Sequence, residues 1–333
     1  MINKPVKFID LFAGIGGFRM ALERIGFQCV YSSEIDKDCK QTYFENYGDF
    51  PDGDITLVNE SSIPDHDILC AGFPCQPFSI SGKQKGFEDV RGTLFFDICR
   101  IVEAKSPQVI FLENVKHLVH HDGGHTFKTI INKLEELGYI LSYKVLNASY
   151  FGVPQNRERI IIIGTKKNRF DFDKINKSIP RPVINDILDT TGDFEFLSPE
   201  EYTLLKEMKT QKISGLIFAG HRNKKIRKAG VRPGTEHLSR VHKQPNRIYS
   251  AKGIHPTIPS QETSGRFFVL LDNMSVRKLT INECYKLMGY PPHFKRTSSL
   301  GKQYKQIGNS VCVPMIEEIA RQIKKQIFDE KEV

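Results

Sequence analysis

Short apolar runs alternate with amphipathic stretches through the first half of this 333-residue chain. The apolar runs cover residues 6–12, 29–36, 66–73, 108–115 and 159–165. Residues 127–138 carry apolar side chains at helical spacing and end on a glycine. Strands that alternate with helices are typical of a parallel, doubly wound α/β sheet. Such a sheet binds its ligands at the carboxyl edge of the strands, so we expect the chemistry there.

The character of the sequence changes after about residue 168. Prolines and glycine-containing turns follow, residues 221–228 (HRNKKIRK) are densely basic, and the β-like pieces at 247–251 and 266–271 are short. This composition predicts a separate, mostly irregular lobe. An amphipathic helix pattern at 313–328 ends the chain, and we expect that helix to pack back on the first domain.

Charge and cysteine content narrow the class of function. The formal net charge of +9 favours a polyanionic partner. The seven cysteines form no CxxC pair and lack clustered histidines, which argues against a disulfide framework and a structural zinc site. No apolar run approaches the roughly 20 residues that span a bilayer, and the N-terminal residues lack a signal-peptide core, so we expect a cytoplasmic protein.

A glycine-rich turn follows the first predicted strand. Its glycines stand at 14, 16 and 17, and Arg19 occupies the place of the last glycine of a GxGxxG pattern, which weakens a nicotinamide or flavin assignment. Glu34 closes the second strand, where a carboxylate can accept hydrogen bonds from both ribose hydroxyls. Asp54 follows a further turn and can accept from an adenine amino group. The three features together predict a nucleoside-type cofactor site.

Cys75 lies in a Pro-Cys-Gln-Pro turn directly after the strand at 66–73. A nucleophilic cysteine needs its thiolate, so its pKa must be lowered by a nearby positive charge or hydrogen-bond donor. Glu113 ends another strand, and residues 155–159 (QNRER) precede the next. If the sheet is parallel, we expect both clusters near the same edge as the thiol. The remaining cysteines fit an inert structural role: Cys29, Cys39, Cys70, Cys99, Cys284 and Cys312.

These motifs together resemble those of the cytosine-5 DNA methyltransferases of bacterial restriction-modification systems. The matching segments are DLFAGIGG, GFPCQPFS, FLENV, QNRER, RKLTINE and QIGNSVCVP, in the family's order from Asp10 to Met315. The resemblance implies the Rossmann-like α/β sheet of an S-adenosylmethionine-dependent methyltransferase, with a smaller, mostly irregular target-recognition lobe. It divides the chain into a catalytic and cofactor-binding domain (1–185), a target-recognition domain (186–272) and a hinge with a returning C-terminal helix (273–333).

The resemblance also implies roles for single residues. The catalytic set is Cys75, Glu113, Arg157 and Arg159. The residues implied for S-adenosylmethionine are Phe12, Gly14, Glu34, Ile35, Asp54, Ile55, Pro74, Leu94, Asn309 and Val311. Those implied for DNA are Ser79, Lys83 and Arg91, in a mobile loop at 79–93, together with Gln244, Arg247 and Thr257 in the second lobe. The product would be S-adenosylhomocysteine, and no metal is expected.

In the implied reaction the Cys75 thiolate adds to C6 of a cytosine that has rotated out of the duplex, and C5 then attacks the methyl group. Glu113 would hydrogen-bond N3 and the exocyclic amino group, and Arg159 would hold O2. Arg247 is placed to give a guanine a bidentate hydrogen-bond pair, so we expect a GC-containing site of about four to six base pairs. The alternative role for Arg247 is a contact with a DNA phosphate.

Three other functions stay open from the sequence: a tRNA cytosine-5 methyltransferase, an inactive DNA-binding paralogue and, disfavoured by Arg19, a nicotinamide oxidoreductase. The long basic lobe favours double-stranded DNA over tRNA as the partner. An intact Cys75, Glu113 and Arg159 argue against an inactive paralogue. We expect a nucleoid-associated bacterial monomer without membrane contact, acting on the same site as a cognate restriction endonuclease.

Overall fold

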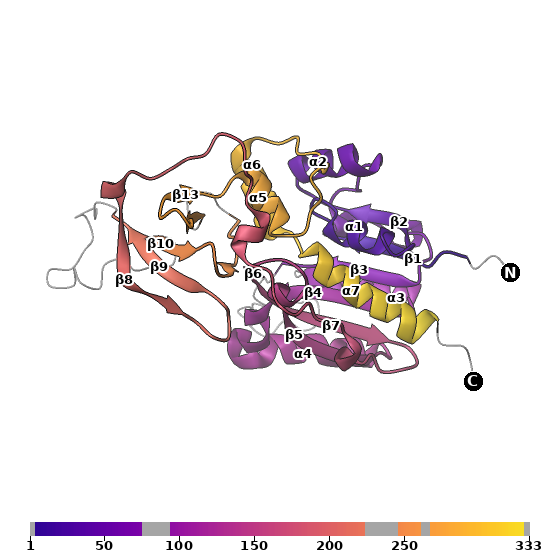
Figure 1. Ribbon diagram of the computed structural model, residues 1–333. Coiled ribbons are helices and arrows are strands. Elements are labelled where there is room, and N and C mark those ends of the chain that lie inside the picture. Colours follow the sequence, from indigo (N-terminus) through magenta and orange to yellow (C-terminus); the bar gives the residue numbers. More distant parts are fainter. Residues whose placement is uncertain (1–3, 75–93, 224–245, 261–266, 330–333) are drawn as a thin grey trace, which may run out of the picture. The chain divides into compact units, whose positions relative to one another are not determined.

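Six strands form the central sheet of the first of two units, which comprises Met1–Asn147, Glu158–Lys177 and Val311–Val333. The computed structural model describes residues 4–74, 94–223, 246–260 and 267–329 (Figure 1). The strand order is β2-β1-β3-β4-β7-β5. The strands are β1 (Lys7–Leu11), β2 (Gln28–Ser33), β3 (Ile68–Gly72), β4 (Val109–Val115), β5 (Ile140–Asn147) and β7 (Glu158–Thr165).

The predicted parallel sheet is correct for β2, β1, β3 and β4 and wrong for β7. β7 lies between β4 and β5 and runs antiparallel to both. Only the segment Ala148–Arg157 joins β5 to β7, and a parallel connection needs a crossover of roughly a dozen or more residues. The chain therefore turns back at this point and gives a mixed sheet.

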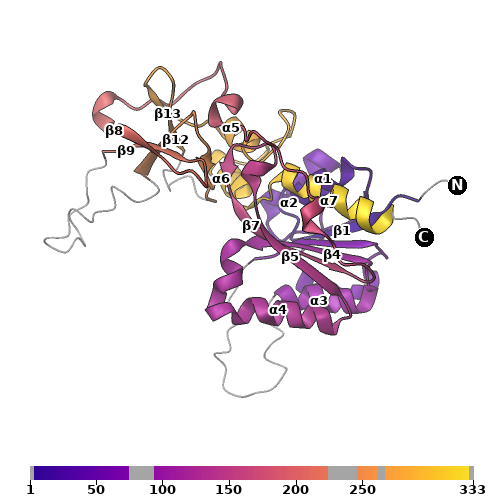
Figure 2. The same cartoon turned by 60° about the horizontal axis from the view of Figure 1, so that its bottom comes forward.

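Helices cover both faces of this sheet, as Figure 2 shows, with α1 and α7 on one side and α3 and α4 on the other. The helices of the unit are α1 (Gly17–Glu23), α2 (Lys37–Tyr47), α3 (Leu94–Lys105), α4 (His125–Glu136) and α7 (Val313–Ile323). Successive side chains of a strand point to opposite faces. Ile9 and Leu11 of β1 accordingly join the core cluster of α3 and α4, while Phe18 of α1 packs edge-on against Phe111 of β4.

The second unit comprises Ala148–Arg157 and Ser178–Ser310. Its five-stranded sheet has the order β13-β12-β10-β9-β8, and β6 pairs separately with β11. The strands are β6 (Gln155–Asn156), β8 (Tyr202–Thr210), β9 (Ile217–Arg222), β10 (Arg247–Ser250), β11 (His255–Pro256), β12 (Phe268–Leu270) and β13 (Val276–Lys278). The helices are α5 (Ile281–Lys286) and α6 (Leu300–Asn309). The predicted β-like pieces are thus strands of one sheet, which makes the described part of the lobe more regular than its composition indicates.

The α/β class with a second, smaller lobe is confirmed. The predicted domain boundaries at residues 185 and 272 separate segments by function, and they stay a prediction. Among the described residues, no helix is long and apolar enough to cross a membrane.

Candidate active site

The glycine turn after β1 has an unusual backbone. Phe12, Gly14 and Gly16 all have positive φ angles, of 57°, 57° and 82°. For a phenylalanine this conformation is strained and persists only where the surroundings hold it. The Ala13 N–H donates to the Ser33 carbonyl at the end of β2. A Cβ added at Gly14 would meet no atom within 4 Å, so the turn borders open space.

The two predicted carboxylates lie at the ends of this region. Glu34 accepts a hydrogen bond from the Gly14 N–H through Oε2 (2.8 Å) and another from the Asp36 N–H through Oε1 (2.7 Å). Asp54 accepts from the N–H and hydroxyl of Thr56 through Oδ1 alone, as a cap of the turn Ile55–Leu57. Each carboxylate keeps acceptor capacity for a ligand, because a carboxylate offers about four lone-pair positions.

Apolar side chains border the same region. Ile35 follows Glu34 directly and is 69% exposed, which is high for an isoleucine. Ile55 belongs to the buried cluster that Phe12 and Leu94 pack against. Val311 is buried close to the Cα of Gly72. The first unit therefore brings the turn, the carboxylates and an apolar surface to one end of the sheet.

The strand that leads to the thiol is fixed by Asn114. Its side-chain amide donates to the Phe73 carbonyl (2.8 Å) in a buried hydrogen bond, and its carbonyl accepts from the Val115 N–H. Pro74, the residue after Phe73, is exposed. Cys75 lies outside the described residues. The end of β3 is thus tied to the end of β4 two residues before the cysteine.

Glu113 and Arg159 form a buried ion pair. Glu113 Oε1 lies 2.9 Å from Arg159 Nε, and the two side chains are only 10% and 11% exposed. They meet because β7 is antiparallel to β4, which sets Arg159 opposite Val115. In a parallel sheet the start of β7 would lie at the opposite edge. Glu113 and Arg159 therefore meet as predicted, although the predicted direction of β7 is wrong. Within the described residues, the buried Glu113 Oε1 accepts no hydrogen bond, although it forms this ion pair.

Arg157 and Asn309 lie in the second unit. Arg157 is buried and donates through Nη2 to the carbonyls of Gly308 (3.1 Å) and Ser310 (2.6 Å). This contact indicates that Arg157 positions backbone, although its predicted catalytic role is not tested by it. Asn309 is exposed at the end of α6.

The predicted DNA contacts are only partly within the described residues. Ser79, Lys83, Arg91 and Gln244 lie outside them. The Arg247 guanidinium lies 5.5 Å from the ring centre of Phe218, at the start of β10. The Thr257 hydroxyl donates to the Asn156 carbonyl (2.7 Å), which is a structural contact. Their DNA-reading roles remain predictions.

Burial raises the thiol pKa of four other cysteines. The pKa of Cys29 and of Cys99 rises to about 12, and those of Cys70 and Cys284 also lie above the ordinary value. These thiols are therefore poor sources of thiolate. Among the described residues, no group of three or more His, Cys, Asp or Glu side chains is arranged to hold a metal ion.

Solved structures share this architecture over nearly the whole chain. A methyltransferase from Entamoeba histolytica superposes with a TM-score of 0.70 at 19% identity, covering 99% of this chain and 100% of that one. A putative DNA modification methyltransferase from an Escherichia coli prophage gives 0.69 at 21% identity, with 98% and 100% covered. At these identities the likeness concerns the fold, which is that of a methyltransferase.

The sequence comparisons identify the family. The model of the C-5 cytosine-specific DNA methylases matches residues 6–325, and the chain belongs to that family. The type II methyltransferase M.HhaI of Haemophilus parahaemolyticus is 45% identical over 96% of this chain and 94% of its own length. M.NlaX of Neisseria lactamica is 41% identical, with 96% of both chains covered. The protein is therefore a DNA (cytosine-5-)-methyltransferase, and its family uses S-adenosylmethionine.

Proposed function

We propose that this protein methylates C5 of one cytosine within a short duplex DNA sequence and so protects host DNA from a type II restriction endonuclease. The observation that carries the proposal is the Glu113–Arg159 pair. It combines a carboxyl group and a guanidinium, buried together, at the end of the sheet where β3 leads into Pro74 and Cys75. The type II methyltransferases at 40–45% identity support the biological role.

The chemistry assigned to the chain's own groups starts at Cys75. Its thiolate adds to C6 of the extruded cytosine, and the electron pair of the C5–C6 bond moves toward C5. C5 becomes nucleophilic and takes the methyl group that S-adenosylmethionine supplies as an electrophile. Loss of the C5 proton to a base then expels the thiolate and restores the ring. The high thiol pKa of the buried cysteines supports the choice of Cys75 over those groups.

Glu113 and Arg159 are assigned to the base itself. As a carboxylic acid, Glu113 would hydrogen-bond N3, where charge develops as sulfur adds to C6, and its carbonyl oxygen would accept from the amino group. The buried Glu113 Oε1 makes no hydrogen bond with the described residues, which suits an atom that meets substrate. Arg159 would hold O2 of the base and orient Glu113 through Nε.

The residues at the glycine turn fit S-adenosylmethionine. Open space beside Gly14 accommodates a ligand close to the backbone, and the exposed face of Ile35 offers an adenine an apolar surface. We assign the ribose hydroxyls to Glu34 and the adenine amino group to Asp54, whose Oδ2 makes no hydrogen bond with the described residues. Phe12, Ile55, Pro74, Leu94, Asn309 and Val311 would complete the site, with S-adenosylhomocysteine as product and no metal required.

The remaining expectations concern partners and location. We propose that duplex DNA binds with Ser79, Lys83, Arg91, Gln244, Arg247 and Thr257 among its contacts. The protein would act as a monomer, in the bacterial cytoplasm and at the nucleoid, on the site that a cognate endonuclease cuts. The net charge of +9 supports binding to a polyanion.

A methyl-transfer assay tests this function. The full-length chain and Cys75→Ser are incubated with labelled S-adenosylmethionine and either duplex DNA or tRNA. We expect transfer to duplex DNA by the wild type alone, with the modified cytosine at one repeated sequence on bisulfite mapping. Transfer to tRNA instead would contradict the proposed substrate. DNA binding without transfer to any substrate would support the inactive paralogue.

A further inference from the structure

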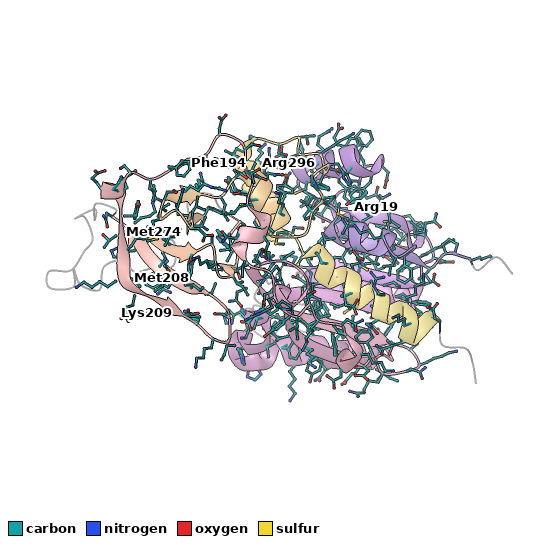
Figure 3. The ribbon with its side chains drawn as sticks, viewed as in Figure 1. Arg19, Phe194, Met208, Lys209, Met274 and Arg296 are labelled. Carbon is teal, nitrogen blue, oxygen red and sulfur yellow. The ribbon has the colours of Figure 1, made fainter. Side chains whose placement is uncertain are left out.

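A cluster of aromatic and charged side chains lies behind the glycine turn, on the side of α1. It consists of Arg19 from α1, labelled in Figure 3, with Tyr43 and Tyr47 from α2 and Asp49 after that helix. We call it the Arg19 cluster. Arg19 fills the position at which the dinucleotide pattern has its last glycine, so the sequence marks this residue only by a departure from that pattern.

The Arg19 cluster contacts the glycine turn through a hydrogen bond to one backbone atom, the carbonyl oxygen of Gly16. The Tyr47 hydroxyl donates to the Gly16 carbonyl at 2.7 Å. The same carbonyl accepts from the Met20 N–H as the first bond of α1, so both of its lone pairs are used. A Cβ at Gly16 would lie 2.3 Å from the Tyr47 ring, so the ring packs directly on this backbone.

Arg19 in turn fixes the two tyrosines. Its guanidinium lies 4.6 Å from the ring centre of Tyr47 and 5.3 Å from that of Tyr43. Nη1 donates to the Tyr43 hydroxyl (3.1 Å) and to both oxygens of Asp49 (2.8 Å each), while Nε pairs with Glu23 (2.8 Å). Four partner residues around one side chain leave the guanidinium little freedom.

The two ends of α2 therefore act on the same turn. Before the helix, Glu34 accepts the Gly14 N–H, and at its last residue Tyr47 donates to the Gly16 carbonyl. The turn between these contacts contains Phe12 in a strained conformation together with two glycines of positive φ. Such a backbone keeps one shape only where its neighbours fix it. A fixed turn binds a ligand more tightly, because less ordering is required on binding.

We propose that Arg19 and Tyr47 are positioning residues for S-adenosylmethionine: through the Gly16 carbonyl they set the shape of the glycine turn and so the affinity for the cofactor. This inference rests on the proposed assignment of that turn to S-adenosylmethionine. Neither residue contacts reacting atoms, so the chemical step should proceed at its usual rate once the cofactor is bound.

Calorimetric titration with S-adenosylhomocysteine and steady-state methyl transfer test the proposal on the full-length protein. Tyr47→Phe removes only the hydroxyl, and we expect roughly two- to tenfold weaker binding and a similar rise in KM for S-adenosylmethionine. The kcat and the KM for DNA should stay within about twofold of wild type. Arg19→Lys keeps the charge and loses the planar fork, and should weaken binding at least as much.

Tyr143→Phe is the matched control. Tyr143 is an exposed tyrosine of β5 in the same unit, and its ring contacts only Phe127 among the aromatic contacts of the described residues. Its binding and kinetics should match wild type. Unchanged binding by both Tyr47→Phe and Arg19→Lys would overturn the inference and leave the cluster a purely structural one, visible only as a lower Tm. A wild type that binds no S-adenosylhomocysteine would overturn the proposed function as well, which distinguishes the two failures.

Discussion

Each unit contains a buried Arg–Glu pair, and the two pairs differ in how completely they are bonded. In the second unit, Arg277 and Glu283 are 3% and 0% exposed and bond twice, at 2.6 and 2.9 Å. Glu283 also accepts from the N–H groups of Asp189 and Thr280, both at 2.7 Å. Arg277 lies over the ring of Phe194, labelled in Figure 3, at 4.3 Å from its centre. Both carboxylate oxygens of Glu283 thus accept hydrogen bonds within the second unit, and we call this pair saturated.

The pair in the first unit is left incomplete. Glu113 and Arg159 share one contact, and within the described residues the buried Oε1 of Glu113 accepts no hydrogen bond. Burying a charged group with unused bonding capacity costs stability. We infer that the saturated pair stabilises the fold, while the incomplete pair is kept for a partner outside the described residues, which we take to be the target base.

The largest effect should come from the incomplete pair. Glu113→Gln keeps the shape of the side chain but cannot donate a carboxyl proton, so we expect kcat to fall by roughly 10²–10⁴-fold. Steady-state methyl transfer at saturating DNA and cofactor measures this, with circular dichroism as a check of the fold. A loss below about threefold would remove Glu113 from the chemistry and break the contrast between the pairs.

The saturated pair should show its effect in stability. Glu283→Gln leaves Arg277 buried without a counter-charge, and we expect the free energy of unfolding to fall by about 3–5 kcal/mol. Glu113→Gln should cost less, because Arg159 is 11% exposed and shares a single contact with Glu113. Urea denaturation followed by circular dichroism compares the two. The double variant Arg277→Met/Glu283→Leu should recover part of the loss, because it buries no unpaired charge. Equal losses at Glu113 and Glu283 would contradict the division of roles.

Arg247 extends the comparison to the DNA contacts of the second unit. If Arg247 gives a guanine a bidentate hydrogen-bond pair, Arg247→Ala should cost about 1–3 kcal/mol of discrimination at one position of the site. If Arg247 contacts phosphate, binding should weaken alike for all sequences. Fluorescence anisotropy with single-base variants of the mapped site separates the two outcomes. Uniform weakening would exclude Arg247 from base reading.

Asp10 provides a further contrast within the first unit. Burial raises the pKa of this carboxyl from 3.8 to about 8, although Arg19 opposes the shift. Between pH 4 and 8 the unfolded chain releases a proton that the folded chain keeps, so stability should fall as pH rises through this range.

Asp10→Asn mimics the protonated carboxyl and should reduce that dependence, by at most about 1.4 kcal/mol per pH unit. Urea midpoints between pH 5 and 8.5 measure it, with the exposed Asp65→Asn as control. Parallel pH profiles for wild type and Asp10→Asn would show that Asp10 does not titrate in this range.

Sequence patterns predicted much of the first unit. The apolar runs at 6–12, 66–73 and 108–115 contain β1, β3 and β4, and the chemically active residues follow their ends. The apolar periodicity and the composition of a segment do not indicate, however, in which direction the strand runs in the sheet. The short connection that makes β7 antiparallel, and so brings Arg159 to Glu113, emerges only from the fold.

Contacts between distant residues were harder to predict. The Tyr47 hydroxyl meets a carbonyl 31 positions earlier, and nothing in the sequence of α2 marks it. The five-stranded sheet is built partly from strands as short as Phe268–Leu270, whose register depends on partners elsewhere in the chain. A single sequence therefore identifies motif residues better than it identifies the residues that hold them in place.

Trapping the covalent adduct tests whether Cys75 attacks C6 of an extruded cytosine. A duplex library carrying 5-fluorocytosine in place of cytosine is incubated with the protein, with and without S-adenosylmethionine. Fluorine cannot leave as the C5 proton does, so we expect a covalent complex that forms stably only with the cofactor. Its tryptic peptide should carry the nucleotide on Cys75. Attachment to any other residue, or an equal yield from Cys75→Ser, would contradict the claim.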